Sequence, residues 1–410
     1  MTDDRPVHRT RLLTARPVAA LAVTALLLPG AVGAVDRFDC LADDPACPRV
    51  MIDGDPWAVL PDGPPSPFRG YGDPSIRKDP ASDRLWLTYS YLSYLAGPGD
   101  PPPVQGTVSV HLASSDDGGA TWQRQRRLWP AETETDVAPP GGLGVSTHEV
   151  SSLAPLDADS LRWFGMEFRY FKPFGAEGRR PNSMHFRLAR AKRPSALGNR
   201  PHSRIGGPLT DEAWRLDLNL STMDPELARC QIWTEPSLFG LDGQIYLVAQ
   251  CLVLQPFTGE RLEDEEFIGV FVSDGKGPIA ELDWRWLGKL SDRADADALG
   301  GDVLTQAEVT TSRDGSLLLL VTPKRLRPVE RHRGCRALEL ESLDPPRLKR
   351  NAAGPPIVRA DLRSSDSTGL GPGLCSYDPA SETGILFVRT EIDLAKPEAI
   401  FSLHETGIHP

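Results

Sequence analysis

One short phrase recurs four times along this 410-residue chain, and it constrains the fold more than any other feature. Each copy is an acid, then Pro or Val, then Ser or Thr: Asp73-Pro74-Ser75, Glu149-Val150-Ser151, Glu235-Pro236-Ser237 and Glu308-Val309-Thr310. The acids are about 70 to 90 positions apart, a period that suits stacked units of short strands. A fifth copy lacks the acid. The segment Asp79-Pro80-Ala81-Ser82, which follows the first phrase, recurs as Asp378-Pro379-Ala380-Ser381, and this places Gly373 near the position of the acid. Such units bury their apolar faces only against one another, so the repeats predict a five-bladed β-propeller.

Within each unit the pattern indicates strands and tight turns. In the first unit, Leu85, Leu87 and Tyr89 alternate with Trp86, Thr88 and Ser90, which predicts a strand over 84–93, followed by strands over 107–114 and 122–128. Later units contain Asp242-Gly243 and Asp314-Gly315 between strand-like runs, a strong hairpin signal. No long amphipathic helix pattern competes, so the expected fold class is all-β.

A second motif lies between the third and fourth predicted strands of the first unit. The segment Ser115-Asp116-Asp117-Gly118-Gly119-Ala120-Thr121-Trp122 fits Ser-x-Asp-x-Gly-x-Thr-Trp. It resembles the Asp-box of sialidase-type propellers. Its Ser and Asp side chains can bond turn amides while Gly supplies a positive φ, so we interpret it as structural and not as part of an active site.

The first 34 residues have the pattern of a cleaved signal peptide. Four arginines within residues 5–16 precede an apolar run over 18–28, and Val32-Gly33-Ala34 offers the small residues of a cleavage site. The apolar run is too short to span a bilayer comfortably. We therefore expect residues 1–34 to be removed, residues 35–67 to form an N-terminal segment that is a candidate for closing the ring, and residues 68–410 to form the propeller domain.

Six cysteines follow the leader, an even number that fits a secreted or periplasmic protein. Their positions suggest three pairs out of the 15 possible connectivities, the alternative being that some are buried free thiols. The suggested pairs are Cys40 with Cys47, Cys230 with Cys251, and Cys335 with Cys375.

Charge and motif content exclude several function classes. The formal net charge of −11 argues against a nucleic-acid partner. We expect no membrane association once the leader is removed, and no cofactor. His148 and His185 lack the paired spacing of metal ligands, so no metal site is predicted.

The repeated acids define the candidate site. The innermost strand of each propeller blade lines the axis, so residues in one register converge on a common channel. Alternation places the residue two positions earlier on the same face, which pairs Tyr71 with Asp73, Trp233 with Glu235, and Gln306 with Glu308. Carboxylates beside aromatic and hydrogen-bonding groups can hold and cleave a sugar. Mutual repulsion should raise the pKa of one carboxyl and so separate a proton donor from a base. The predicted substrate-binding residues are Tyr71, Glu149, Trp233, Gln306 and His148.

The phrase Gly72-Asp73-Pro74-Ser75-Ile76 and the strand after it, repeated in five units, resemble the five-bladed propeller glycosidases of glycoside hydrolase families 43 and 32. The resemblance implies an Asp on the first blade as base or nucleophile, an auxiliary acid on the third, and a Glu on the fourth as proton donor. By register these roles fall to Asp73, Glu235 and Glu308. The context Thr234-Glu235-Pro236 leaves Glu235 as an alternative donor.

The resulting hypothesis is a secreted glycoside hydrolase that acts on an oligo- or polysaccharide, with inversion favoured by the width of the funnel. Two other function classes remain open. A sialidase-like exo-enzyme would share the Asp-box but needs an arginine triad and a Tyr-Glu pair. A non-catalytic carbohydrate- or protein-binding propeller would keep the fold and make the acids dispensable.

Overall fold

The computed structural model describes residues 35–410 apart from 61–62, 100–103, 138–140, 157–161, 176–177, 257 and 394–397. The predicted signal peptide lies outside the described residues. Strands dominate this part of the chain, whose single described α-helix is α1 (Arg293–Ala298). Short 3-10 helices lie in the connections, at Pro181–Ser183, Pro194–Asn199, Glu212–Trp214, Leu220–Thr222, Pro225–Leu227, Glu263–Glu265 and Ile279–Glu281.

The first two antiparallel sheets follow the chain order. The first contains β3 (Phe68–Lys78), β4 (Leu85–Ala96), β5 (Val104–Ser115) and β6 (Trp122–Trp129). The second contains β8 (Leu143–Pro155), β9 (Trp163–Pro173), β10 (His185–Ala191) and β11 (His202–Gly206), with β7 (Glu132–Thr135) and β12 (Leu218–Asn219) at its edges. The strands predicted over 84–93, 107–114 and 122–128 correspond to β4, β5 and β6.

Two further sheets repeat this arrangement. One contains β13 (Ile232–Leu241), β14 (Gln244–Leu252), β15 (Phe267–Ser273) and β16 (Arg285–Ser291). The next contains β17 (Val303–Thr311), β18 (Leu317–Arg325), β20 (Cys335–Leu343) and β22 (Val358–Arg363), with β19 (Arg331–His332) on β18 and β21 (Pro346–Leu348) on β20. The predicted turn at Asp242-Gly243 joins β13 to β14, and both residues have positive φ, at 51° and 73°.

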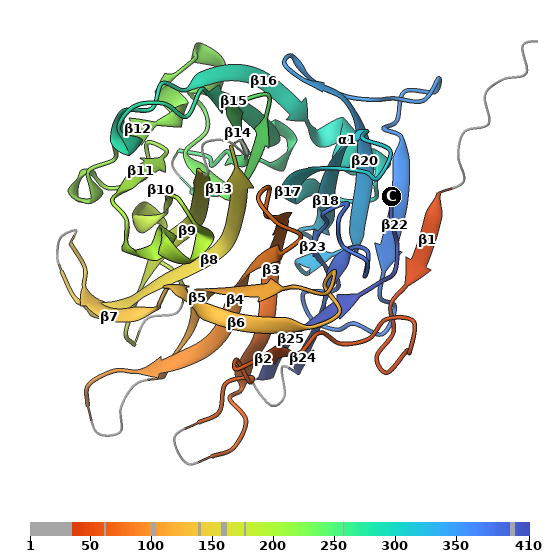
Figure 1. Cartoon of the computed structure of the whole chain (residues 1–410). Coiled ribbons are helices and arrows are strands. Elements are labelled where there is room, and N and C mark those ends of the chain that lie inside the picture. The colour runs from red at the N-terminus through yellow and green to blue at the C-terminus, as the bar shows by residue number, and fades with distance from the viewer. Residues whose placement is uncertain are drawn as a thin grey trace, which may run out of the picture. The chain divides into compact units, whose positions relative to one another are not determined.

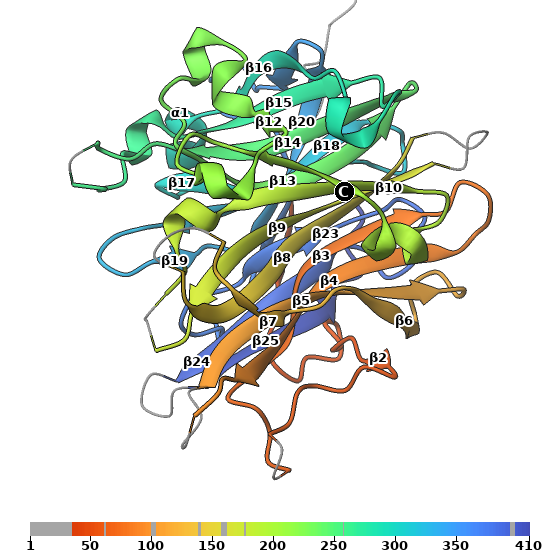
Figure 2. The ribbon, with the colours of Figure 1, turned by 90° about the vertical axis from the view of Figure 1, so that its left-hand side faces the viewer.

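The last strands are β23 (Gly373–Ser376), β24 (Leu386–Asp393) and β25 (Glu398–Glu405), and they close the circle. β25 pairs in parallel with the start of β3, with Phe401 opposite Gly70. A Cβ atom at Gly70 would lie 1.8 Å from the Phe401 carbonyl oxygen, so this contact requires glycine. In Figures 1 and 2 the blue C-terminal strands accordingly lie beside the orange first strands.

The first strand of each group lies inside and the cores lie between the groups. Among the described residues, β3, β8, β13, β17 and β23 contact one another in that order, and β23 contacts β3. Five apolar clusters alternate with the strand groups: Trp86, Leu128 and Trp163 lie between the first two, and Leu386 and Tyr89 lie between the last and the first. Figure 1 shows the groups following one another around the molecule from orange through green to blue. The all-β propeller is confirmed; the blade count stays a prediction, which these contacts support.

Residues 36–53 run along the outside of the ring. β1 (Asp36–Asp39) adds in parallel to β22, the backbone of Val50 bonds Leu403 of β25, and β2 (Ile52–Asp53) adds in parallel to β6. The segment thus bridges the outer edges of the fourth, fifth and first strand groups. β25 also pairs with β3 and so joins the fifth group to the first, and the role of residues 35–67 in closing the ring stays a prediction.

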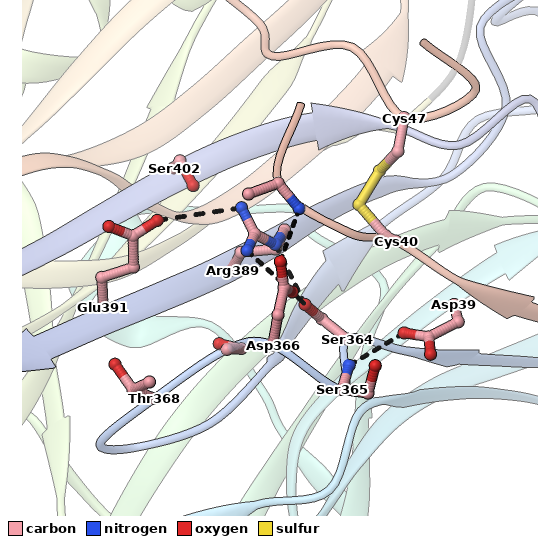
Figure 3. A network of polar contacts seen from close by, with 12 residues as sticks. Asp39, Cys40, Cys47, Ser364, Ser365, Asp366, Thr368, Arg389, Glu391 and Ser402 are labelled. Carbon is pink, nitrogen blue, oxygen red and sulfur yellow. Dashed lines mark hydrogen bonds and ion pairs between the residues drawn. A yellow bond between two sulfur atoms is a disulfide. The ribbon is translucent and has the colours of Figure 1, made fainter. Parts of the chain in front are cut away.

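Two carboxylates fasten this N-terminal segment to the loop after β22, as Figure 3 shows. Asp39 accepts a hydrogen bond from the Ser365 amide at 2.8 Å. Asp366 accepts one from the Ala42 amide at 2.7 Å and also contacts the buried Arg389 guanidinium at 2.8 Å. The disulfide between Cys40 and Cys47 lies next to this network.

All three predicted disulfide pairs are present: Cys40 with Cys47, Cys230 with Cys251, and Cys335 with Cys375. The free-thiol alternative is therefore wrong for these residues. The segment 115–122 forms a turn between β5 and β6 in which Ser115 Oγ accepts the Gly119 amide at 2.9 Å and Asp117 accepts the Thr121 amide at 2.9 Å. These contacts are local and structural, as its sequence indicated.

Candidate active site

Each inner strand contains a bulge whose first residue has a positive φ. The pairing shifts by one residue between Gly72 and Ser75, and equivalent shifts occur in the other four inner strands. The residues with positive φ at these shifts are Asp73 (43°), Val150 (49°), Glu235 (54°), Gln306 (49°) and Leu374 (58°). Such values are uncommon outside glycine and concentrate at functional sites. The bulges therefore mark one level of the ring as a candidate site.

These bulges correct the register assumed from the sequence. Asp73 and Glu235 occupy the bulge position itself, but Glu149 lies one residue before it. Glu308 lies two residues after the bulge on β17, where the other strands have serines: Ser75, Ser152 and Ser237. The four acids thus do not share one register. Asp73 and Glu235 match each other, on inner strands separated by β8.

Asp73 is held by side chains on two other strands. Ser90 of β4 donates to its Oδ2 at 2.6 Å, and Gln306 Nε2 of β17 contacts its Oδ1 at 3.3 Å. Burial and the charge of Glu149 raise the pKa of Asp73 to about 6, while Ser90, the Val150 amide and Arg179 act in the opposite direction. Gln306, predicted to bind substrate, instead contacts this carboxylate directly.

Glu235 has the larger pKa shift. Burial, followed by the charges of Asp73 and Glu149, raises its pKa to about 8, and Lys324 and Arg179 only partly offset this rise. Its Oε2 atom is buried and has no hydrogen-bond partner among the described residues. An unpartnered, protonated carboxyl oxygen is available to donate to a bound ligand.

Glu149 joins the same cluster from β8. Tyr170 of β9 donates to its Oε2 at 3.0 Å, and Arg179 Nη1 contacts its Oε1 at 3.2 Å. The Arg179 guanidinium also lies over the Tyr170 ring, 4.5 Å from its centroid. This cation and phenol therefore hold Glu149, whose charge raises the pKa values of Asp73 and Glu235.

Glu308 lies in a different environment. Arg77 of β3 forms an ion pair with it, and both side chains are almost fully buried. Ser376 Oγ donates to Glu308 Oε1 at 2.8 Å, while Arg77 Nη2 reaches the Val309 carbonyl at 3.0 Å. Burial raises the pKa of Glu308, the ion pair with Arg77 and the hydrogen bond from Ser376 lower it, and the charge of Asp378 raises it. Glu308 therefore differs from the other two acids predicted to be catalytic, because it is held in a buried ion pair.

Three residues predicted to bind substrate are buried elsewhere. Tyr71 is fully buried and donates to the Asp55 carbonyl. Trp233 packs in an apolar cluster, with Nε1 donating to Ser221 Oγ at 2.9 Å. His148 is paired with Glu167 at 2.9 Å. Tyr71 and Trp233, each two positions before an acid, do not lie on the same face as that acid, because the bulge interrupts the alternation of side chains.

Sequence reasoning missed four groups that act on the cluster: Ser90, Tyr170, Arg179 and Lys324. Ser90, Tyr170 and Lys324 belong to second strands of their sheets, and Arg179 to the connection after β9. Strand pairing brings two of them to the cluster, since Ser90 lies opposite Gly72 and Tyr170 lies opposite Thr147. The repeated phrase alone does not predict this pairing.

Metal and membrane features are limited in the described residues. One group there has metal-ligand spacing, Cys40, Cys47 and His404, but its two cysteines form a disulfide. Asp73, Glu149 and Glu235 do not converge closely enough to form such a group. No described helix has the length and apolar character needed to cross a bilayer. The predictions of no metal and no cofactor stay predictions.

No protein-family model matches the chain, and no curated protein matches it. Solved structures that resemble it include a native arabinanase from Bacillus subtilis, at 14% identity over 81% of this chain and 92% of that chain, with a TM-score of 0.38. A glycosyl hydrolase from Bacteroides ovatus matches at 12% identity over 92% and 96%, with a TM-score of 0.42. An exo-1,5-alpha-L-arabinanase from a bovine ruminal metagenomic library matches at 12% identity over 83% and 92%, with a TM-score of 0.38. By name these proteins are two arabinanases and a glycosyl hydrolase.

Proposed function

We propose that this protein is a secreted glycoside hydrolase in which Asp73 and Glu235 are the catalytic carboxyl pair. One observation carries the proposal: two acids at equivalent bulges of non-adjacent inner strands have pKa values raised to about 6 and about 8. Paired carboxyls whose environments push their pKa values apart are the arrangement that glycosidic cleavage needs.

The two pKa values suggest the roles. At neutral pH a carboxyl with a pKa of about 8 is mostly protonated, and one with a pKa of about 6 is mostly ionised. Glu235 then donates its proton to the glycosidic oxygen as the bond breaks. Asp73 acts on the other face of the sugar, as base toward water or as nucleophile. Glu235 thus replaces Glu308 as the proposed proton donor, because Glu308 is held in an ion pair with Arg77.

Glu149, Tyr170 and Arg179 serve this pair as positioning groups. Arg179 and Glu149 are partly exposed, with side-chain exposures of 44% and 17%, so both can reach a ligand. Their charges also act on Asp73 and Glu235, so a ligand that contacts either of them would alter the protonation of the pair. We propose that this group binds sugar hydroxyls next to the bond that is cleaved.

Stereochemistry is a separate part of the proposal. A wide funnel that leaves room for a water molecule between the two carboxyls favours inversion, whereas closer carboxyls give retention through a covalent intermediate. Proton NMR of the anomer released in the first minutes of hydrolysis distinguishes them, because mutarotation is slower. Release of the same anomer as in the substrate would contradict inversion and leave the catalytic pair intact.

The sialidase-like alternative receives one favourable observation and one unfavourable one. Tyr170 and Glu149 form a Tyr-Glu contact. Burial and Glu149, however, raise the pKa of Tyr170 well above its ordinary value, which disfavours the phenolate that a tyrosine nucleophile requires. The two cations whose charges lower the pKa of Glu235 are a lysine and an arginine, Lys324 and Arg179, whereas a sialidase-like site needs an arginine triad. The carboxyl pair therefore remains the better-supported mechanism.

The deciding experiment is a screen of chromogenic glycosides, followed by variants on any verified substrate. We expect Asp73→Asn to reduce turnover by about 100-fold or more with little change in folding. Glu281→Gln, an exposed glutamate remote in sequence from both acids, is the matched control and should behave like the wild type. Full activity of Asp73→Asn would reject the catalytic pair. Sugar binding without turnover by the wild type would favour the binding propeller.

A further inference from the structure

A cavity of about 430 Å³ outside the acid cluster is lined by four arginines: Arg331, Arg333, Arg336 and Arg363. It lies where β19, the start of β20 and the loop after β22 meet. Asp39 and Ser365, visible in Figure 3, line its other side. Such a concentration of positive charge is unexpected in a chain whose formal net charge is −11.

The protein itself compensates only part of this charge. Asp361 contacts Arg336 Nη1 at 2.7 Å and Arg363 Nη2 at 2.8 Å, so one carboxylate serves two guanidinium groups. Asp39 adds a second negative charge, and its Oδ1 accepts the Ser365 amide. No carboxylate of the described residues forms an ion pair with Arg331 or Arg333. Among the charged residues that line the cavity or pair with its arginines, four arginines face two aspartates, an excess of two positive charges.

Only one of the four arginines is buried. Arg336 is 5% exposed, and burial together with the charges of Arg363, Arg333 and Arg37 disfavours its charged form, whereas Asp361 favours it. Arg331, Arg333 and Arg363 are exposed. Like charges held close together repel one another unless an anion compensates them, and these exposed guanidinium groups are open to an anion from solution.

The cavity is also held in a fixed shape. The Gly334 amide donates to the Pro372 carbonyl at 2.8 Å, and the Arg333 amide donates to the Pro323 carbonyl at 2.8 Å. Arg331 Nη2 bonds the Ser367 carbonyl at 2.9 Å, and the disulfide from Cys335 to Cys375 ties the start of β20 to β23. A preformed wall of guanidinium forks suits recognition of an oxyanion group.

The position of the cavity relates it to the candidate active site. His332 lines the cavity and pairs with Lys324 across β19 and β18, and Lys324 in turn pairs with Val303 at the start of β17. Lys324 is the cation that most lowers the pKa of Glu235. The cavity therefore lies toward the same end of β17 and β18 as the bulge at Gln306.

We propose that this arginine cavity binds the anionic group, carboxylate or sulfate, of an acidic glycan. The identity of the ligand as a glycan rests on the proposed function, whereas anion binding itself rests only on the cavity. Arg331 and Arg333, which have no carboxylate partner in the part of the chain that the structure describes, would contact the anion, and Arg336 and Arg363 would supply the surrounding positive charge.

Calorimetric titration of the full chain tests the proposal without any need for turnover. The probes are a hyaluronan tetrasaccharide for the carboxylate, a chondroitin sulfate tetrasaccharide for the sulfate, the methyl-esterified hyaluronan tetrasaccharide as the uncharged match, and inorganic sulfate. We expect at least one charged tetrasaccharide to bind, with affinity that falls as salt rises. The double variant Arg331→Gln/Arg333→Gln should weaken this binding roughly tenfold or more.

Arg285→Gln, which removes an exposed arginine far along the chain, is the matched control and should bind like the wild type. Equal affinity for the charged and methyl-esterified probes, or undiminished binding by the double variant, would overturn the proposal. Binding of inorganic sulfate alone, lost in the double variant, would support an anion site but overturn the glycan assignment. An inactive protein that still binds the charged tetrasaccharide would reject the proposed hydrolysis and retain this site.

Discussion

Arg77 of β3 and Glu308 of β17 form a buried ion pair that joins two non-adjacent inner strands of the ring. Arg77 also bonds the carbonyls of Val309 at 3.0 Å and of Leu238, on β13, at 3.3 Å. Glu308 in turn accepts a hydrogen bond from Ser376 of β23 at 2.8 Å. One guanidinium and one carboxylate thus link four of the inner strands, which gives Glu308 a structural role.

Breaking this pair should destabilise the fold without removing the chemistry. Arg77→Met leaves a buried carboxylate without its cation, and we expect the free energy of unfolding to fall by about 3–5 kcal/mol. Urea denaturation measures the loss. The double variant Arg77→Met/Glu308→Leu should recover much of it, because no uncompensated charge remains. A loss of under about 0.5 kcal/mol in the single variant would show that the pair is not important for stability.

Glu308→Gln tests whether Glu308 takes part in catalysis. The amide keeps the hydrogen bonds of the buried site but lacks a proton to donate, so we expect turnover per folded molecule to stay close to the wild-type value. Glu235→Gln, with the same chemical change, should lower turnover by about 100-fold or more on substrates with poor leaving groups. Steady-state rates on two aryl glycosides that differ in leaving-group pKa make the comparison. The reverse outcome would restore Glu308 as the donor.

Glu235 should also make stability depend on pH. Its pKa is about 8 in the folded protein and near 4.5 when unfolded, so the folded state binds the proton more tightly. The contribution of this proton to stability is complete below about pH 4.5 and is lost as pH rises through 8. Glu235→Gln should therefore be more stable than the wild type at pH 8.5, by a few kcal/mol, and close to it at pH 4.5. Denaturant titrations at both pH values, with Glu281→Gln as control, measure the difference. If the free energies of unfolding of Glu235→Gln and the wild type differed by the same amount at both pH values, this result would contradict the raised pKa of Glu235.

The same pair predicts a bell-shaped dependence of turnover on pH. Asp73 must be ionised and Glu235 protonated, so activity should rise around pH 6 and fall around pH 8. Because the two groups interact, these limits belong to the pair. Glu235→Gln should lose the alkaline limb on substrates whose leaving groups need no protonation. Persistence of that limb would assign it to another group.

Export and processing can be tested by mass. We expect secreted protein to begin near Val35 and to contain no free thiols, since the leader pattern precedes that residue and all six cysteines are paired. Intact-mass measurement before and after alkylation under denaturing conditions checks both points. Secreted material that retains residues 1–34 would contradict the signal peptide.

The sequence by itself determined the local structure of this protein. Alternating apolar residues predicted individual strands such as β4, and Asp242-Gly243 predicted the turn between β13 and β14, since both signals act between near neighbours. The spacing of the cysteines also led to the correct pairs. The phrase Asp-Pro-Ser and its counterpart Glu-Pro-Ser identified Asp73 and Glu235, the two acids that lie at bulges.

Tertiary structure decided which other residues join them. A shift of one residue turns a side chain to the opposite face of a strand, and the bulge inserts such a shift beside every acid. Glu149 and Glu308 look equivalent in the repeated phrase, yet pairing with β9 and β18 places the first in the acid cluster and the second against Arg77. Arg179 and Lys324 reach the cluster from outside the repeated phrase. Strand pairing between residues far apart in the chain sets these positions, and no local pattern encodes it.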